Sequence, residues 1–296
     1  MNLACGIGII ELVIEELECM KLEYDSLRKG KASLLALLDE AEVAEAVYNS
    51  NAIENSTLTL KQTEQILLEL EFSSDLSLRE IYEAKNLARV VEYIRAKSKE
   101  QELNQEMIVL LHKMLLGGID DKIAGRLRAV GEYVRVANHV AAAPEKLEEL
   151  LQMAFVNYSS SISRNIIERI AEFHLEFENI HPFCDGNGRI GRVLINYQLQ
   201  RQGFPPVIIR DKEKADYYSA FRDYDSSHKT RGMEKILILA IQESIHKRLA
   251  YMKGLKIMRL SNYAKTQDRS LSALSNSAKR QTIAAFREKG VWKIGV

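Results

Sequence analysis

Cysteine is scarce in this chain, whose 296 residues include three, Cys5, Cys19 and Cys184. Three widely spaced thiols supply neither a disulfide framework nor the ligand set of a structural zinc site, so we expect a reducing compartment. Cys184 is interpreted as a packing residue rather than a nucleophile.

An excess of charge of one sign is also missing, because lysine plus arginine and aspartate plus glutamate both number 41. A balanced chain has no overall field that draws it to nucleic acid or to a membrane surface, although local patches remain open. The hydrophobic share of 46% and the charged share of 28% are ordinary for a globular protein.

Long apolar runs are missing as well. The first twenty residues are apolar in character, but they lack a basic leader, and Glu11, Glu15 and Glu16 interrupt them before they reach a membrane-spanning length. We therefore expect a cytoplasmic protein with no membrane association. Internal repeats, low-complexity segments and long disordered linkers are not found either.

Helical spacing of apolar residues dominates what is present. Lys29-Gly30-Lys31 is the expected break between two N-terminal helices. Thr59 and Ser77 begin capping-box patterns, and helical spacing resumes at Pro144 and runs toward residue 181. His112 and His174 lie on apolar faces and are interpreted as core histidines.

One dodecamer, from His181 to Arg192 with the sequence HPFCDGNGRIGR, concentrates chemically active residues. Helical spacing precedes it and restarts after Arg189, so the glycine-containing stretch 185–188 forms a tight turn at a helix N-terminus. Glycines allow close approach to the backbone, and unpaired N–H groups and the helix dipole favour an anion. Phosphate is the expected ligand.

The residue types in this turn indicate roles. Asp185 is a hard oxygen ligand suited to a magnesium ion beside phosphates. Arg189 and Arg192 can bind phosphate oxygens and offset the charge that builds during transfer. His181 can accept a proton from an attacking hydroxyl. Together they predict phosphoryl or nucleotidyl transfer.

The dodecamer resembles the signature HPFxDGNGRxxR of the Fic family at every specified position. The resemblance implies a mainly α-helical bundle with a short β-hairpin, called the flap, and an activity that transfers AMP from ATP to a Ser, Thr or Tyr hydroxyl of a protein. Family members that phosphorylate instead carry lysine at the position of Gly188, so Gly188 favours AMP transfer. The ATP phosphates would lie on Gly186, Asn187 and Gly188, with magnesium held by Asp185.

A second motif lies far upstream. Ser50 and Glu54 are four residues apart and share a helix face, and Asn55 is a plausible helix end. This stretch resembles the inhibitory motif [S/T]xxxE[G/N] of Fic proteins, on a helix expected at about 34–55. The resemblance implies that Glu54 pairs with Arg192 and blocks the ATP γ-phosphate. The alternative is that Glu54 is one more solvated helix carboxylate.

The family resemblance extends to two other segments. The flap is expected around residues 133–140, and its Val136, Ala137, Asn138 and His139 would face nucleotide or target. For His139, a plain surface hairpin is an equally good interpretation. The segment 216–225 resembles part of an adenine pocket, in which the nucleotide would contact Tyr217, Tyr218 and Asp225; buried packing of the tyrosines is the alternative.

Three stretches are expected: an N-terminal helical region at 1–100, a catalytic domain at 101–250 and a small module at 251–296. The last resembles a helix-turn-helix or winged-helix unit, for which DNA binding through Lys279, Arg280, Gln281 and Arg287, dimerisation and target docking are all open. A homodimer is therefore among the expected partners, with ATP and an unidentified target protein.

Three functions follow from these predictions. The first is AMP transfer to proteins, including the chain itself, with inhibition by Glu54. The second is AMP removal by the same residues, with Glu54 aligning a water. The third is DNA-binding regulation through residues 251–296, against which the complete dodecamer counts.

Overall fold

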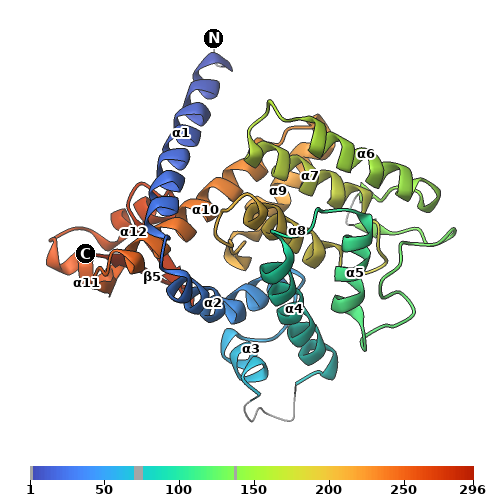
Figure 1. The fold of residues 1–296 in the computed structure, drawn as a ribbon, viewed down its shortest axis with the longest axis horizontal. Coiled ribbons are helices and arrows are strands. Elements are labelled where there is room, and N and C mark those ends of the chain that lie inside the picture. The colour runs from blue at the N-terminus through green and yellow to red at the C-terminus, as the bar shows by residue number, and fades with distance from the viewer. Residues whose placement is uncertain (1–2, 70–75, 137–138) are drawn as a thin grey trace. The chain divides into compact units, whose positions relative to one another are not determined.

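The computed structural model describes residues 3–69, 76–136 and 139–296, with only the backbone described at 3–12, 136 and 139. It is mainly helical (Figure 1). Two compact units are formed, one by residues 1–42, 204–207 and 238–296 and the other by residues 43–203 and 208–237. These units cut across the three sequence stretches, so that division stays a prediction. None of the described helices is both long and apolar enough to cross a bilayer.

The larger unit contains the end of α2 (Ala32–Ile53) and the start of α10 (Arg231–Met252). Between them lie the helices α3 (Leu60–Leu67), α4 (Leu78–Lys97), α5 (Gln105–Leu116), α6 (Leu147–Ser160), α7 (Ile166–Ile180), α8 (Asn187–Arg201) and α9 (Lys214–Ser227). Helix α8 packs against α4, α5 and α7 (Figure 1). Its apolar residues Ile190, Leu194 and Tyr197 are 0%, 1% and 0% exposed, which makes α8 the centre of the core.

The helix ends near the N-terminal motif follow local rules. Asn55, at φ +66°, ends α2 with a Schellman pattern in which Ser56 N donates to Asn51 O and Asn55 N to Ala52 O. This confirms the predicted helix end and leaves Glu54 on the final turn. The predicted capping box at Thr59 is also confirmed.

Two predictions about helices are wrong. Ser77 precedes α4 without a side-chain cap, because Glu80, its expected capping-box partner, instead accepts from Ser56 Oγ and Thr57 N. The helical run from Pro144 to the dodecamer is interrupted at 161–165, where Asn165 caps the start of α7 by accepting from Ile167 N.

The expected hairpin is present. Strands β1 (Arg135–Val136) and β2 (His139–Val140) pair antiparallel, with Val136 opposite His139. Ala137 and Asn138, which the family resemblance placed at the nucleotide, lie outside the described residues. The pairing confirms a hairpin at the predicted position and says nothing of what its side chains contact.

The smaller unit combines α1 (Leu3–Leu27), the start of α2 and the end of α10 with a C-terminal module. The predicted break between α1 and α2 is confirmed, with Gly30 at φ +75°. The module contains β3 (Ile257–Arg259), α11 (Leu260–Thr266), α12 (Leu271–Lys279), β4 (Ala285–Glu288) and β5 (Val291–Gly295), and its antiparallel sheet has the order β3-β5-β4. The two helices and the three-stranded sheet surround a small apolar core, and the winged-helix-like unit expected from the sequence stays a prediction.

Candidate active site

The dodecamer forms a loop between two helices of the larger unit. Helix α7 ends at Ile180, and His181 adopts the left-handed region at φ +50°. Helix α8 begins at Asn187 after Gly186, which has φ +82°. The buried Asn187 side chain accepts from Phe183 N at 2.9 Å and donates to Phe183 O at 2.8 Å, so this amide fixes the loop.

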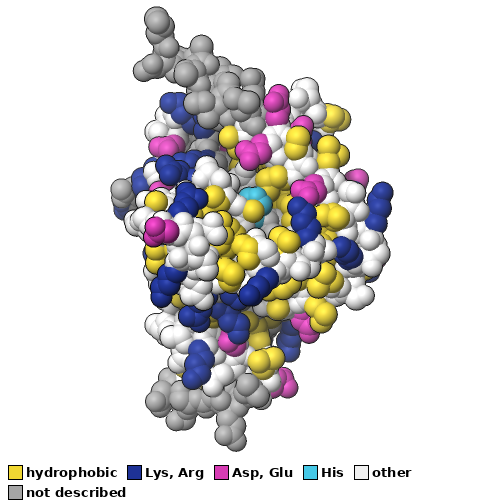
Figure 2. All heavy atoms as spheres, turned by 90° about the vertical axis from the view of Figure 1, so that its left-hand side faces the viewer, with side chains coloured by type: hydrophobic (Ala, Val, Ile, Leu, Met, Phe, Trp, Pro, Cys, Tyr) yellow, Lys and Arg dark blue, Asp and Glu magenta, His cyan; other side chains and the backbone are white. Residues whose placement is uncertain are grey.

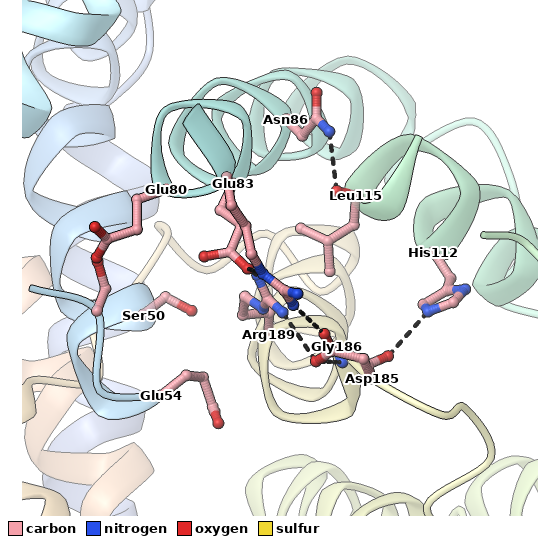
Figure 3. A network of polar contacts seen from close by, with 12 residues as sticks. Ser50, Glu54, Glu80, Glu83, Asn86, His112, Leu115, Asp185, Gly186 and Arg189 are labelled. Carbon is pink, nitrogen blue, oxygen red and sulfur yellow. Dashed lines mark hydrogen bonds and ion pairs between the residues drawn. The ribbon is translucent and has the colours of Figure 1, made fainter. Parts of the chain in front are cut away.

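His112 on α5 supports the same loop from behind. Its Nδ1 accepts from Gly125 N at 3.0 Å, so its Nε2 carries the proton and donates to Asp185 O at 3.0 Å (Figure 3). Its ring stacks on Phe183 with centroids 3.7 Å apart. Burial lowers the pKa of His112 to about 4, which keeps it neutral. His112 is thus a buried histidine with both nitrogens paired, as expected.

Arg128, which sequence patterns did not single out, holds the other side of the loop. It is 3% exposed and donates to four backbone carbonyls, those of His181 (2.8 Å), Ile180 (3.2 Å), Ala142 (2.7 Å) and Glu132 (3.0 Å). One guanidinium therefore ties the end of α7 to the segments on both sides of the hairpin. No local sequence signal identifies it, because all its acceptors are backbone atoms.

The His181 ring is oriented by Glu178, one turn earlier on α7. Nδ1 of His181 lies 3.3 Å from the Glu178 carbonyl oxygen and 4.0 Å from its Oε2. A carbonyl only accepts hydrogen bonds, so in the neutral ring Nδ1 holds the proton and Nε2 presents a lone pair. This is the tautomer that a general base needs.

A chain of charges surrounds Asp185. Its Oδ1 accepts from Gly186 N at 2.6 Å and Arg189 at 3.1 Å, and its Oδ2 accepts from Arg79 at 2.6 Å. Arg189 also pairs with Glu83 at 3.1 Å, and Figure 3 shows Glu83, Arg189 and Asp185 in succession. Burial of Asp185 favours its neutral form, but Arg189, the Gly186 N–H and Arg79 outweigh it and lower its pKa.

Asp185 fits a magnesium ion by its chemistry. It is an ionised carboxylate beside a helix N-terminus, and the side chain of its partner Arg79 is 58% exposed and has room to withdraw. Within the described ranges, no group of three or more His, Cys, Asp or Glu side chains could hold a metal. A single carboxylate suits an ion that keeps most of its waters and is completed by phosphate oxygens.

Arg192 joins the two motifs across 138 residues of chain. It is 5% exposed, and its Nη2 donates to Glu54 Oε1 at 2.8 Å and to the Ser50 carbonyl at 2.8 Å, while its Nε donates to Ser50 Oγ at 3.0 Å. The ion pair that the family resemblance implied is therefore present. Among the described residues, Nη1 of Arg192 has no hydrogen-bond partner.

Gly188 allows the Glu54 carboxylate to lie directly on the start of α8. A Cβ atom at this position would come within 2.2 Å of Glu54 Oε1 and 3.1 Å of Arg192 Nη1. A side chain at residue 188 would displace both groups. The Glu54 carboxylate thus lies against the first turn of α8, where N–H groups without intrahelical acceptors favour an anion.

These residues line one cleft of about 360 Å³. Its walls combine the end of α2 and the following loop, the start of α4, and the dodecamer: Asn51, Glu54, Asn55, Ser56, Arg79, Glu80, Glu83, His181, Cys184, Asp185, Gly186, Asn187, Gly188 and Arg189. The proposed base, carboxylate and anion turn therefore meet in one place. Ser50 and Arg192 lie behind Glu54, outside the lining.

The structure does not bring the three predicted adenine-pocket residues to this cleft. Tyr217 is 1% exposed and hydrogen bonds with His174 at 2.7 Å, so the buried alternative holds for it. Tyr218 donates to Ile53 O at 3.2 Å, and Asp225 accepts from Asn179 at 3.4 Å. Only Tyr218, which is 37% exposed, keeps a surface on which a base could stack.

Glu178 is a second residue that sequence patterns missed. Its carboxyl side chain is 12% exposed, and its Oε1 would lie 2.4 Å from a Cβ at Gly191. Burial is the main cause that raises its pKa to about 8, with Glu54 adding to the effect and Arg192 opposing it. A carboxyl group that is protonated near neutral pH thus lies next to the His181 ring.

Comparison with known proteins agrees with this geometry. Residues 102–199 match the model of the Fic/DOC family. The chain is 38% identical over 177 residues to protein adenylyltransferase Fic of Nematostella vectensis and 35% identical over 179 residues to fic-1 of Caenorhabditis elegans, which covers 58% and 59% of this chain. It spans about 41% and 35% of the lengths of those two relatives.

Solved structures of Fic proteins are similar to this chain as well. Fic-1 of C. elegans (residues 134–508) superposes with a TM-score of 0.74 at 27% identity, covering 84% of this chain and 73% of that one. A Fic-domain-containing signaling protein of Bacteroides thetaiotaomicron superposes with a TM-score of 0.70 at 25% identity, covering 82% and 97%.

Proposed function

The chain carries a domain of the Fic/DOC family, and on that premise we propose that it transfers AMP from ATP to a Ser, Thr or Tyr hydroxyl of a protein, itself included. The observation that carries the proposal is the cleft, which His181 lines together with the turn at the start of α8. The relatives named protein adenylyltransferase support it.

In this proposal the phosphates of ATP bind the first-turn N–H groups of α8, at Asn187, Gly188 and Arg189. Arg192 Nη1, buried and without a partner among the described residues, is available for a phosphate oxygen. The Asn187 side chain is already used by Phe183, so Asn187 would contribute its backbone N–H rather than its amide.

His181 acts as the general base. The target hydroxyl gives its proton to Nε2 while its oxygen forms a bond to the α-phosphorus, and the bond from that phosphorus to the pyrophosphate oxygen breaks. The Glu178 carbonyl holds Nδ1 and stabilises the imidazolium that results. Asp185 would hold a magnesium ion, which supplies charge neutralisation on the phosphates.

Glu54 holds the resting enzyme off in this proposal. Its carboxylate occupies Arg192 and lies on Gly188, where a phosphate would have to bind, and two like charges cannot share that space. Its side chain is 38% exposed, so a modest displacement of the end of α2 would release it.

A second activity, AMP removal, is favoured by the same exposure of Glu54. A carboxylate that lines the cleft beside the anion turn can orient a water toward a phosphorus bound there. Removal would then require Glu54, whereas transfer would be inhibited by it.

The test is AMP incorporation from α-labelled ATP with magnesium, comparing wild type, Glu54→Gly and Glu54→Gly with His181→Asn. Strong labelling is expected only with the single variant Glu54→Gly. Glu40→Gln, on an exposed part of α2, and Glu54→Gln form a matched pair that separates this carboxylate from helix charge in general. Equal labelling with and without His181 would overturn the proposal.

A pre-modified protein that loses AMP with wild type but not with Glu54→Gly would establish removal.

A further inference from the structure

The balanced charge of the whole chain conceals a strong local excess. Residues 251–296 contain ten lysines and arginines and two acids, Asp268 and Glu288. The remaining residues therefore carry a matching negative excess. A positive excess of this size in a small module is the electrostatic signature of a polyanion-binding surface.

Most of this positive charge is exposed and unpaired. Three basic residues of the module are bound to acids, Lys253 to Glu23, Arg287 to Glu243 and Lys293 to Glu288. Six others are exposed and form no ion pair with any described residue: Lys256, Arg259, Lys265, Arg269, Lys279 and Arg280. Figure 2 views the molecule from the side on which Figure 1 shows α11 and α12, and dark-blue side chains outnumber magenta ones there.

Helix α12 presents a polar face within this surface. Leu274 and Ala278 point into the module core and are 0% exposed. The exposed positions Ser272, Asn276 and Arg280 follow at intervals of four, so hydrogen-bonding side chains and a guanidinium lie along one face. A helix with such a face fits the major groove of duplex DNA, where base edges offer donors and acceptors.

Other polyanions fit less well. A membrane-binding helix needs an available apolar face, but that face of α12 is used by the core. Single-stranded nucleic acids are bound by stacking on exposed aromatic rings. The four aromatic residues of the module are not exposed: Phe286 is fully buried, and Tyr251, Tyr263 and Trp292 are partly buried.

We propose that residues 251–296 bind duplex DNA, with α12 in the major groove and the six unpaired basic residues on the phosphates. This inference does not depend on the proposed enzyme activity, because no residue of the cleft takes part. Neutralising four to six phosphates makes binding strongly salt-dependent, with a loss of roughly 10² to 10³ in affinity between about 50 and 200 mM salt.

The test is fluorescence anisotropy of the full chain with a mixed-sequence duplex about two helical turns long. The variant Arg269→Ala, Lys279→Ala, Arg280→Ala should bind roughly 10- to 100-fold more weakly and lower the salt slope by roughly three. The matched control Arg222→Ala, Lys229→Ala, Lys235→Ala removes three exposed charges from the larger unit and should leave binding unchanged.

Four outcomes would overturn the proposal: no binding at low salt, equal losses in both triple variants, tighter binding to single strands than to duplex, or binding to phosphatidylserine vesicles without binding to duplex. Thermal melting of each variant shows that it is folded. Unchanged AMP incorporation by the module variant would show that the two activities are separate.

Discussion

The cleft and the C-terminal module both rely on arginine, and they use it in opposite ways. Arg189 and Arg192 are 4% and 5% exposed and are held by acids and backbone carbonyls. Arg269 and Arg280 are exposed and have no ion-pair partner among the described residues. The buried pair can only act at a fixed position, whereas the exposed pair supplies a field and adapts to what binds. Preorganisation suits catalysis, and an exposed positive surface suits a polyanion.

The largest expected effect is on AMP transfer, and it tests the preorganised cleft. His181 and His228 both end helices in the left-handed region, at φ +50° and +51°, and asparagine tolerates that conformation. His181→Asn should reduce AMP transfer by roughly 10² to 10⁴ because the base is lost, whereas His228→Asn should leave it unchanged. Label incorporation in the Glu54→Gly background measures both. Comparable losses from the two substitutions would point to backbone distortion instead of base catalysis.

The next effect is on stability, which should depend on a buried arginine much more than on an exposed one. Arg128→Ala leaves four carbonyls without their donor and should lower the free energy of unfolding by about 3 kcal/mol. Arg280→Ala, at the exposed end of α12, should change it by less than about 0.5 kcal/mol. Urea unfolding of the two variants checks the difference.

Glu178 predicts a pH dependence. Its pKa is raised to about 8 in the folded protein, whereas the unfolded chain releases this proton above about pH 4.5. Between these two pH values the folded state therefore binds more protons than the unfolded state. Its contribution to stability is therefore full at low pH and falls as pH rises from about 4.5 to 8. Glu178→Gln should remove this loss, gaining on the order of 4 kcal/mol over wild type at pH 8 and little at pH 4.5. Denaturant unfolding at both pH values measures it. Glu148→Gln, at an exposed position, should show no such trend.

The smallest effect concerns helix caps in the two regions. Ser270 caps α12 by accepting from Ala273 N at 3.4 Å, whereas Ser77 makes no side-chain cap for α4. Ser270→Ala should cost about 1 kcal/mol or less, and Ser77→Ala only a few tenths. Thermal unfolding would contradict this if the Ser77 substitution were the more destabilising one.

Much of the site was visible in the sequence because its chemistry is local. The glycine turn, the acid and the histidine of the dodecamer lie within twelve residues, and the structure places them in one cleft. The end of α2 at Asn55 and the capping box at Thr59 also follow from neighbouring residues. Arg128 and Glu178 were not visible, since their roles come from carbonyls and charges brought in by other segments.

The wrong capping-box prediction has the same origin. The capping box at Ser77 was lost because Glu80 found stronger partners in the loop after Glu54, twenty-four residues away from Ser56. For Tyr217, where pocket and core were both open from the sequence, the structure shows a buried side chain against His174 and Arg192 of other helices. The balanced charge of the whole chain says nothing of where the basic residues lie, because counting ignores position.

The sequence by itself determined the helical class, the glycine turn at the start of α8 and the inventory of candidate catalytic groups, because backbone conformation and side-chain chemistry act over a few residues. Only the tertiary structure decided which charges are paired. It places Glu54 on Gly188 and Arg192, holds the loop with Arg128, and leaves the basic residues around α12 exposed. The physical reason is that burial and pairing determine how strongly a charge interacts with its surroundings, and both depend on segments distant in the chain.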